Sequence, residues 1–225
     1  MQRIENDSWN GAAALQFKTV SGKSYRFKYR SYRPFELGKM YIGTNKLIYV
    51  IDEANKDLYE AGLKAIRNIK YPKAKFENEF KNAFPKIVLK DKTDIGYVVV
   101  MDKPPGSVLL QDLIDYMPDK VIDPKHVAWM VGALYNMTTF LDFIDVTHNS
   151  ILPTTLFVDP KEHTVTLLGG WWYSVKVGDK IKAVPSELRK ILPNELFDKK
   201  IAKSTYDRQA VKGTAIGCLG DPSLV

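Results

Sequence analysis

The 225-residue chain contains 45% hydrophobic and 26% charged residues and has a formal net charge of +7. This length and composition fit one large domain or two small lobes and exclude a disordered chain. A single cysteine, Cys218, excludes an internal disulfide framework, and three scattered histidines indicate no metal site. No apolar run approaches the roughly 18 residues of a membrane span, and residues 1–11 lack the apolar core of a signal peptide. We therefore expect a soluble, cytoplasmic protein with no cofactor, no metal and no membrane partner.

The first half of the chain predicts strands and one helix. Alternation of apolar and polar residues and intervening turn residues such as Ser-Gly-Lys and Thr-Asn-Lys indicate paired strands. From residue 52 to residue 69 the apolar spacing becomes helical. A lysine-rich segment, 70–92, then precedes a Val-rich run that is typical of a buried strand. The predicted strands are 14–20, 24–33, 39–43, 47–52 and 95–102.

The segment KPPGS at residues 103–107 is the clearest boundary in the chain, because proline denies strand continuation and glycine favours a turn. Beyond it the pattern is mainly helical and encloses one short hairpin, LFVD and TVTLL. Strands segregated from helices predict an α+β fold with a strand-rich small lobe, residues 1–103, and a mainly helical large lobe, residues 104–225. The predicted helices are 108–117, 124–143, 185–197 and 206–219.

This serial order resembles the protein kinase-like fold. VVVMDKPPGSVLLQDLI is similar to a kinase hinge, in which Met101, Asp102 and Lys103 stand where adenine hydrogen-bonds in the family. The following segment HNSILPTTLFVD is similar to a catalytic loop and the strand after it. The resemblance therefore implies two lobes joined by a connector.

Several positions match motifs of the family one by one. His148, Ser150 and Thr155 have the spacing of H-R-D-x-x-x-x-N, and Pro153 falls where many kinases have proline. Asp207 is similar to the aspartate of the central large-lobe helix, which in the family accepts hydrogen bonds from the catalytic-loop backbone. The resemblance thus implies structural roles for His148, Pro153 and Asp207.

The residues that carry phosphoryl transfer in the family are replaced. Ser150 stands in place of the base and Thr155 in place of a magnesium-binding asparagine, while Gly169 or Leu168 takes the place of the D-F-G aspartate. Serine is no carboxylate base near neutral pH, and hard cations prefer carboxylate oxygens. Residues 164–178 contain no Asp, Glu, Asn or Gln that a shifted alignment could supply.

The small lobe is also incomplete. Gly38 and Gly43 do not form G-x-G-x-x-G, and neither Lys46 nor Glu60 can be assigned to a lysine–glutamate pair. The resemblance therefore implies a pseudokinase-like protein that acts by binding a protein partner, as a regulator or a scaffold. An atypical active kinase is the weaker alternative. The short length and degenerate motifs are also similar to those of bacteriophage kinase-like proteins.

Two basic segments support an alternative function as a nucleic-acid or polyanion-binding module. YRFKYRSYR, residues 25–33, interleaves aromatic and basic side chains, and residues 70–92 are rich in lysine. In a strand, however, alternation places the aromatic residues on the core side and the basic residues in solvent. The candidate polyanion contacts are Arg26, Lys28, Arg30, Arg33, Lys73 and Lys75.

Two further features leave open how a partner would bind. Trp171, Trp172 and Tyr173 would form a partner site if exposed, and would plug the former nucleotide cleft or fill the core if buried. An apolar face on Tyr206 to Leu219 would need a cover, which predicts a homo-oligomer or a subunit of an assembly such as a viral particle. In the viral case the expected location is the host cytoplasm or the virion.

Overall fold

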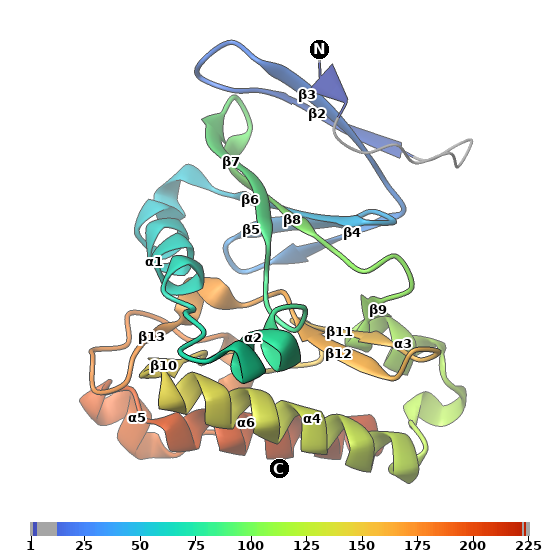
Figure 1. Cartoon of the computed structure of the whole chain (residues 1–225), viewed down its shortest axis with the longest axis vertical. Coiled ribbons are helices and arrows are strands. Elements are labelled where there is room, and N and C mark those ends of the chain that lie inside the picture. Colours follow the sequence, from blue (N-terminus) through green and yellow to red (C-terminus); the bar gives the residue numbers. More distant parts are fainter. Residues whose placement is uncertain (1, 4–12, 222, 224–225) are drawn as a thin grey trace. The chain divides into compact units, whose positions relative to one another are not determined.

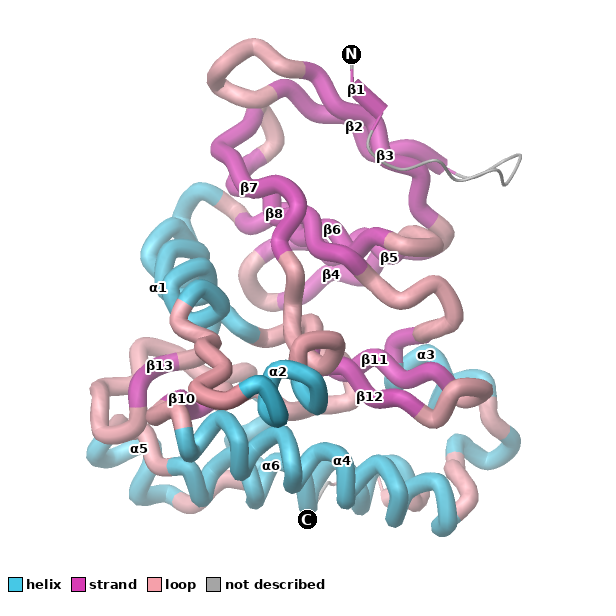
Figure 2. The backbone as a smooth tube through the Cα atoms, in the orientation of Figure 1, coloured by secondary structure: helices cyan, strands magenta, loops and turns pink. Residues whose placement is uncertain are grey.

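The computed structural model describes residues 2–3, 13–221 and 223. Contacts within the chain divide it into two compact units, Met1–Tyr59 with Pro85–Gly106, and Glu60–Phe84 with Ser107–Val225. We call them the strand unit and the helix unit. Figures 1 and 2 show the strands concentrated in the first and the helices in the second, which confirms the predicted α+β class.

The strand unit contains a five-stranded antiparallel sheet with the order β4-β5-β6-β8-β7. Two of its three inner strands, β6 and β8, carry side chains that are almost completely buried, as the Val-rich pattern of residues 95–102 predicts for β8. A 3₁₀ turn, Glu53–Asn55, follows β6. The strands are β4 (Ser31–Phe35), β5 (Gly38–Ile42), β6 (Lys46–Ile51), β7 (Ile87–Thr93) and β8 (Gly96–Asp102).

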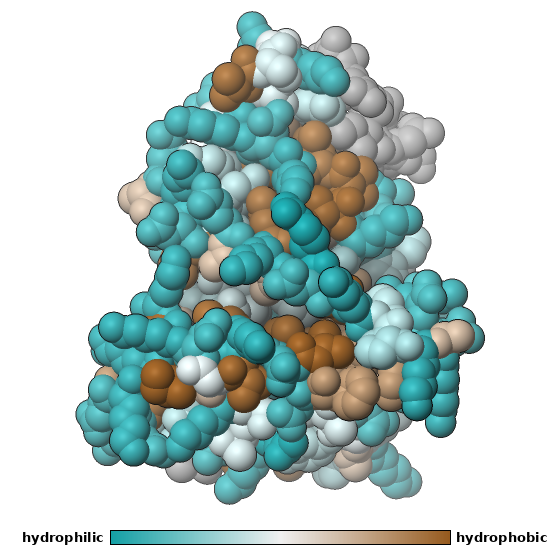
Figure 3. Space-filling model, turned by 60° about the vertical axis from the view of Figure 1, so that its left-hand side comes forward, coloured by the Kyte–Doolittle hydropathy of each residue, from teal (hydrophilic) through white to brown (hydrophobic). Residues whose placement is uncertain are grey.

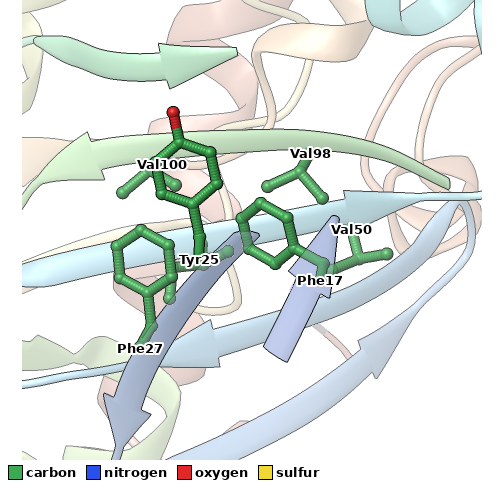
Figure 4. Packing of buried hydrophobic residues seen from close by; sticks show 7 residues of the cluster. Phe17, Tyr25, Phe27, Val50, Val98 and Val100 are labelled. Atoms are coloured by element: carbon green, nitrogen blue, oxygen red, sulfur yellow. The ribbon is translucent and has the colours of Figure 1, made fainter. Parts of the chain in front are cut away.

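A second, three-stranded sheet covers one face of the first. It has the order β1-β3-β2 and consists of β1 (Gln2–Arg3), β2 (Ala13–Lys18) and β3 (Ser24–Tyr29). Figure 4 shows the rings of Phe17, Tyr25 and Phe27 directed at valines of the larger sheet. Arg26, between two buried aromatic residues, is exposed. The predicted alternation of a buried and a solvated side is therefore confirmed for β3.

Three segments that the sequence predicts as single elements are each divided into two elements in the structure. Segment 24–33 divides at Arg30, whose N–H donates to Ile42 O at 2.8 Å, so that β3 and β4 belong to different sheets. Segment 108–117 begins as a strand, β9 (Val108–Leu109), and continues as α3 (Leu110–Tyr116). Segment 185–197 is interrupted at Pro193, which lacks an N–H and begins a new helix. Its two parts are the 3₁₀ helix Ser186–Lys190 and α5 (Asn194–Lys199).

The helix unit is organised around α4 (Pro124–Phe143) and α6 (Ser204–Cys218), which run side by side. Asp123 caps α4 by accepting the N–H of Lys125 at 2.8 Å, and Pro124 occupies the first helical position. The predicted helix 124–143 is confirmed with its bounds. The remaining elements are α1 (Lys56–Arg67, which crosses the division of units), α2 (Ala74–Phe80), the 3₁₀ turns Pro118–Lys120 and Trp171–Tyr173, and the strands β10 (Val146–Thr147), β11 (Leu156–Asp159), β12 (Thr164–Leu167) and β13 (Val175–Lys176).

The predicted boundary between lobes needs a correction, because Glu60–Phe84 groups with the helix unit and not with residues 1–59. The reason is an aromatic ladder between this segment and α4. Phe80 stacks on Phe140 with ring centroids 4.7 Å apart, and Phe76 and Phe84 lie 5.8 and 5.7 Å from the same ring. Aromatic residues four positions apart thus dock the lysine-rich segment onto α4.

The surface carries few large apolar side chains. Figure 3 shows a face that is largely hydrophilic, with separate hydrophobic patches. Among the described residues, Tyr116, Val20 and Phe143 are the most exposed large side chains of this kind. No helix in the described ranges has the length and hydropathy needed to cross a membrane.

We predict that Phe27→Ala destabilises the protein by about 3–5 kcal/mol, because it leaves a cavity between the two sheets where Phe27 is fully buried. The measurement is the shift of the urea unfolding midpoint. Val20→Ala, at a position that is 76% exposed, is the control and should leave the midpoint unchanged. Equal shifts for both variants would contradict the packing of the second sheet.

Candidate functional site

The candidate site is the loop from His148 to Thr155, whose backbone is held by a buried carboxylate of α6. Asp207 accepts the backbone N–H of His148 at 2.7 Å and that of Asn149 at 2.8 Å. Burial raises the pKa of Asp207 to about 6, although the two backbone hydrogen bonds act in the opposite direction. At neutral pH the side chain is therefore ionised and holds the loop by charge-assisted bonds. This is the contact that the kinase resemblance implies for Asp207.

Asn149 connects the loop to the aromatic segment that follows β12. Its backbone has φ of 57°, in the left-handed region that asparagine tolerates better than most residues. Its side-chain amide donates to Thr147 Oγ1 and to Tyr173 O, both at 3.1 Å. The residue next to His148 thus has a structural role within the helix unit.

His148 is completely buried, and its ring meets the ring of Trp171 edge to face at 4.8 Å. Burial lowers its pKa to about 3, and backbone groups of Gly169 and Ser150 oppose only part of this effect. Neither ring nitrogen has a hydrogen bond of good geometry within the described residues. The imidazole is therefore neutral at physiological pH.

Ser150, at the position of the catalytic base, is also completely buried. Its hydroxyl finds no hydrogen-bond partner among the described residues. The chain at Gly170 lies directly against it, since a Cβ at Gly170 would be 2.6 Å from Ser150 Oγ and 2.8 Å from His148 Cε1. The side chain is thus enclosed by the chain's own backbone.

Thr155, at the position of a metal-binding asparagine, closes the loop on itself. Its hydroxyl lies 2.6 Å from Ser150 O as donor and accepts the N–H of Leu152 at 3.1 Å. Pro153 is buried between these residues, and its carbonyl accepts the N–H of Gln111 at 3.0 Å. The hydroxyl of Thr155 and the carbonyls of Ser150 and Pro153 are therefore engaged within the helix unit.

The segment after β12 is packed into the core of the helix unit. Trp171, Trp172 and Tyr173 are 0%, 1% and 5% exposed, so the alternative of an exposed aromatic partner site is wrong. Trp171 Nε1 donates to Leu167 O at 2.9 Å. Trp172 lies against Gly62 of α1, where a Cβ would come within 2.4 Å of the indole. These aromatic residues fill space, as their burial requires.

The D-F-G position supplies no side-chain oxygen in the structure. Leu168 and Gly169 are both buried, and the N–H of Gly169 donates to Thr155 O at 2.9 Å. Within the described part of the chain, no group of three or more His, Cys, Asp and Glu side chains is arranged to hold a metal ion. The donor set expected of a magnesium site does not occur in this loop.

The hinge residues lie in the strand unit and are bound to their neighbours there. Asp102 Oδ1 pairs with Lys46 Nζ at 2.9 Å. The N–H of Asp102 donates to Lys86 O at 2.9 Å, and that of the buried Lys103 donates to Asn45 O at 3.0 Å. Met101 is fully buried in β8. Both of these backbone donors of the predicted hinge are thus already engaged by the protein.

The connection between β4 and β5, where the family has its glycine-rich loop, is a tight turn. Phe35 and Gly38 are paired across the two strands, which leaves Glu36 and Leu37 between them. Leu37 is buried. Gly38 is required for packing, because a Cβ there would lie within 2.1 Å of Val50 O.

The predicted polyanion contacts are divided between the two units. Arg26, Lys28, Arg30 and Arg33 belong to the strand unit, whereas Lys73 and Lys75 belong to the helix unit. Arg33 is half-buried, and both lysines are exposed.

The expected apolar face of Tyr206 to Leu219 is largely covered by the chain itself. Tyr206, Ala210 and Val211 are buried in the helix unit, where α6 packs on α4. Leu219 is 46% exposed, and Arg208 pairs with Asp142 at 2.8 Å on the outer side. The face on which the predicted homo-oligomer depends is therefore occupied, and oligomerisation stays a prediction.

Sequence reasoning missed a hollow of about 270 Å³ between α3, α4 and the turn of the β11–β12 hairpin. His126 and His163, which look scattered in the sequence, line it with ring centroids 5.6 Å apart. Trp129 meets His163 edge to face at 5.5 Å. No sequence spacing signals this cluster, because the residues come from elements that are distant along the chain.

Comparison with solved structures places the fold. The chain is similar to the structure of vaccinia related kinase 3, with a TM-score of 0.67 and 16% sequence identity over 95% of this chain and 70% of that chain. No protein-family profile matches the sequence, and no curated protein sequence matches it. The class defined by fold and site is therefore a protein kinase-like fold. At this identity the similarity concerns the fold alone.

We predict that Gly170→Ala destabilises the protein by several kcal/mol, because the new Cβ would overlap Ser150 and His148 at a backbone φ of 78°. Gly178→Ala is the matched control, with φ of 84° and no atom within 4 Å of the new Cβ. It should cost about 1 kcal/mol for the left-handed backbone alone. Equal shifts of the urea midpoint would show that the contact at Gly170 is not tight.

We predict that His148 makes folding sensitive to acid. Its folded pKa of about 3 lies below the ordinary 6.5, so the stability contributed by its neutral form is present above pH 6.5 and is lost as the pH falls toward 3. His148→Leu removes this dependence, and wild type should therefore lose stability relative to the variant over that range. Unfolding free energies of both proteins at pH 7, 6, 5 and 4 test this, and parallel curves would contradict it.

Proposed function

We propose that this protein is a catalytically inactive kinase-like protein that acts by binding a protein partner, in a regulatory or scaffolding role. The observation that carries the proposal is that Ser150 stands in place of the base and is completely buried. A base must reach the proton that it abstracts, whereas Ser150 has no carboxylate and is enclosed against Gly170.

The replaced metal positions support the same conclusion. In phosphoryl transfer the magnesium ions neutralise charge that develops between the phosphates, so their ligands are as necessary as the base. Thr155 uses its hydroxyl inside the loop, and Gly169 and Leu168 offer none. Three functional positions are thus replaced while the loop around them keeps its anchor, Asp207.

The strand unit gives independent support. The backbone N–H groups of Asp102 and Lys103 are bound to Lys86 and Asn45, and Lys46 is paired with Asp102. The two backbone donors that stand where adenine binds in the resemblance are therefore engaged within the unit. A retained scaffold without these groups is suited to binding macromolecules by its surface.

We predict no magnesium- or manganese-dependent phosphoryl transfer from ATP, either to the protein itself or to generic protein substrates. The measurement is transfer of labelled γ-phosphate, together with a thermal-shift titration with ATP and ADP with and without magnesium. We expect no transfer and no magnesium-dependent shift of the melting temperature.

Ser150→Ala is the control variant, because it removes a hydroxyl that has no partner and should leave stability nearly unchanged. Transfer by wild type that Ser150→Ala abolishes would overturn the proposal and show an atypical kinase. Transfer that persists equally in the variant would identify a contaminating kinase and leave the predicted inactivity in place.

A further inference from the structure

The hollow between α3, α4 and the β11–β12 hairpin has an apolar floor. Ile122, Met130 and Val158 are 4%, 5% and 2% exposed and line this space, which has a volume of about 270 Å³. Leu113 and Met117, one turn apart along the chain of α3, form a wall and are half-buried. Figure 1 shows α3 and the hairpin next to the first half of α4. All these residues belong to the helix unit, so the hollow is a feature of one compact unit.

Three aromatic rings stand at the mouth of the hollow. His126 and Trp129 lie three residues apart on one side of α4, near its start, and His163 lies in the turn of the hairpin. The rings of His126 and His163 have centroids 5.6 Å apart and planes inclined by 20°. Trp129 meets His163 edge to face at 5.5 Å. Both histidines are exposed and Trp129 is half-buried, so the mouth is aromatic and open to solvent.

The nitrogen atoms of these three rings are available to a ligand. Within the described part of the chain, no hydrogen bond involves the ring nitrogens of His126, His163 or Trp129. An indole N–H donates, and an imidazole in its neutral form has one donor and one acceptor. Asp123, which also lines the hollow, accepts the N–H of Lys125 as the cap of α4. Donors and acceptors thus stand at the edge of an apolar space, which is the usual composition of a small-molecule site.

The hairpin turn holds the backbone of His163 in an unusual conformation. Asp159 Oδ1 accepts the N–H of Lys161 at 3.0 Å and that of Glu162 at 3.1 Å, which fixes the turn. His163 has φ of 47°, in the left-handed region that costs a residue with a Cβ atom free energy. Glycine would fit this backbone better, so the turn carries an imidazole at a cost to stability. Because the turn and the helix cap already fix the backbone at both histidines, few groups need to be ordered when a ligand binds.

We propose that this hollow binds a small, uncharged aromatic heterocycle of two fused rings. A protein cavity of about 150 Å³ holds benzene, so a hollow of about 270 Å³ has room for a second ring. The flat ligand lies on the apolar floor, and the indole N–H of Trp129 donates to one of its ring nitrogens. His126 or His163 pairs with a second ring nitrogen. The proposal is independent of the proposed function, since the hollow shares no residue with the loop from His148 to Thr155.

The test is a titration of the isotope-labelled, full-length protein with benzimidazole, followed through the indole N–H signals in nitrogen–proton correlation NMR spectra. Trp129→Phe identifies the signal of Trp129 by its loss. We expect this signal to shift as the site fills, while the signals of the buried Trp171 and Trp172 stay in place. Imidazole, the probe with one ring, should bind about tenfold more weakly, because it covers less of the apolar floor.

His163→Gly tests the aromatic mouth in a variant that should stay folded. Glycine adopts φ of 47° without strain, so the melting temperature should change little. The affinity for benzimidazole should fall about three- to tenfold, which is the size of one aromatic contact. Lys200→Gly is the matched control, because Lys200 has φ of 54° and is an exposed residue outside the hollow. It should leave the affinity unchanged.

Three results would overturn the proposal. One is a Trp129 signal that does not move with a few millimolar benzimidazole in a protein that melts cooperatively. Another is equal affinity of wild type and His163→Gly for benzimidazole. The third is tighter binding of N-acetyltryptophanamide than of benzimidazole, which would assign the hollow to an aromatic side chain of a partner polypeptide and not to a free heterocycle.

Discussion

The buried carboxylate of Asp207 is the constraint on which the rest of the candidate site depends. A charged group inside a protein is tolerated when strong donors compensate its desolvation, and here the donors are the N–H groups of His148 and Asn149. The pair of bonds fixes the loop onto α6. This geometry requires no catalytic side chain, because it uses backbone groups that any sequence supplies.

The loop around this anchor is closely packed. Gly170 brings the chain against Ser150 and His148, and Gly62 lets Trp172 pack against α1. Each contact requires a residue without a Cβ atom, so steric packing explains why glycine occupies both positions. The resulting core is dense and aromatic, and it occupies the place where the resemblance puts the D-F-G turn.

In the helix unit the hydroxyl of Thr155 is used inside the loop and the side chain of Ser150 is buried, and the proposed function rests on these two observations. In the strand unit the aromatic side of the β2–β3 hairpin is buried on the larger sheet, and Arg26, on its other side, is exposed. Neither feature depends on the other.

The sequence by itself determined the α+β class, the strand alternation of β3 and the bounds of the helix at 124–143. These depend on local periodicity, proline and residue identity, which act over a few positions along the chain. The family resemblance predicted that Asp207 accepts hydrogen bonds from the backbone of the loop. The hairpin at 156–167 was predicted by its strands and turn.

Only the tertiary structure decided where segments that are distant along the chain meet. The spacing of Phe76, Phe80 and Phe84 was visible, but Phe140, on which they dock, lies some sixty residues away. The sequence pattern likewise did not predict that the aromatic segment at 171–173 is buried. Nor did it predict that Tyr29, Tyr32 and Tyr41 pack together. The physical reason is that packing is non-local: whether an aromatic ring fills the core or faces solvent depends on which surface the fold brings against it.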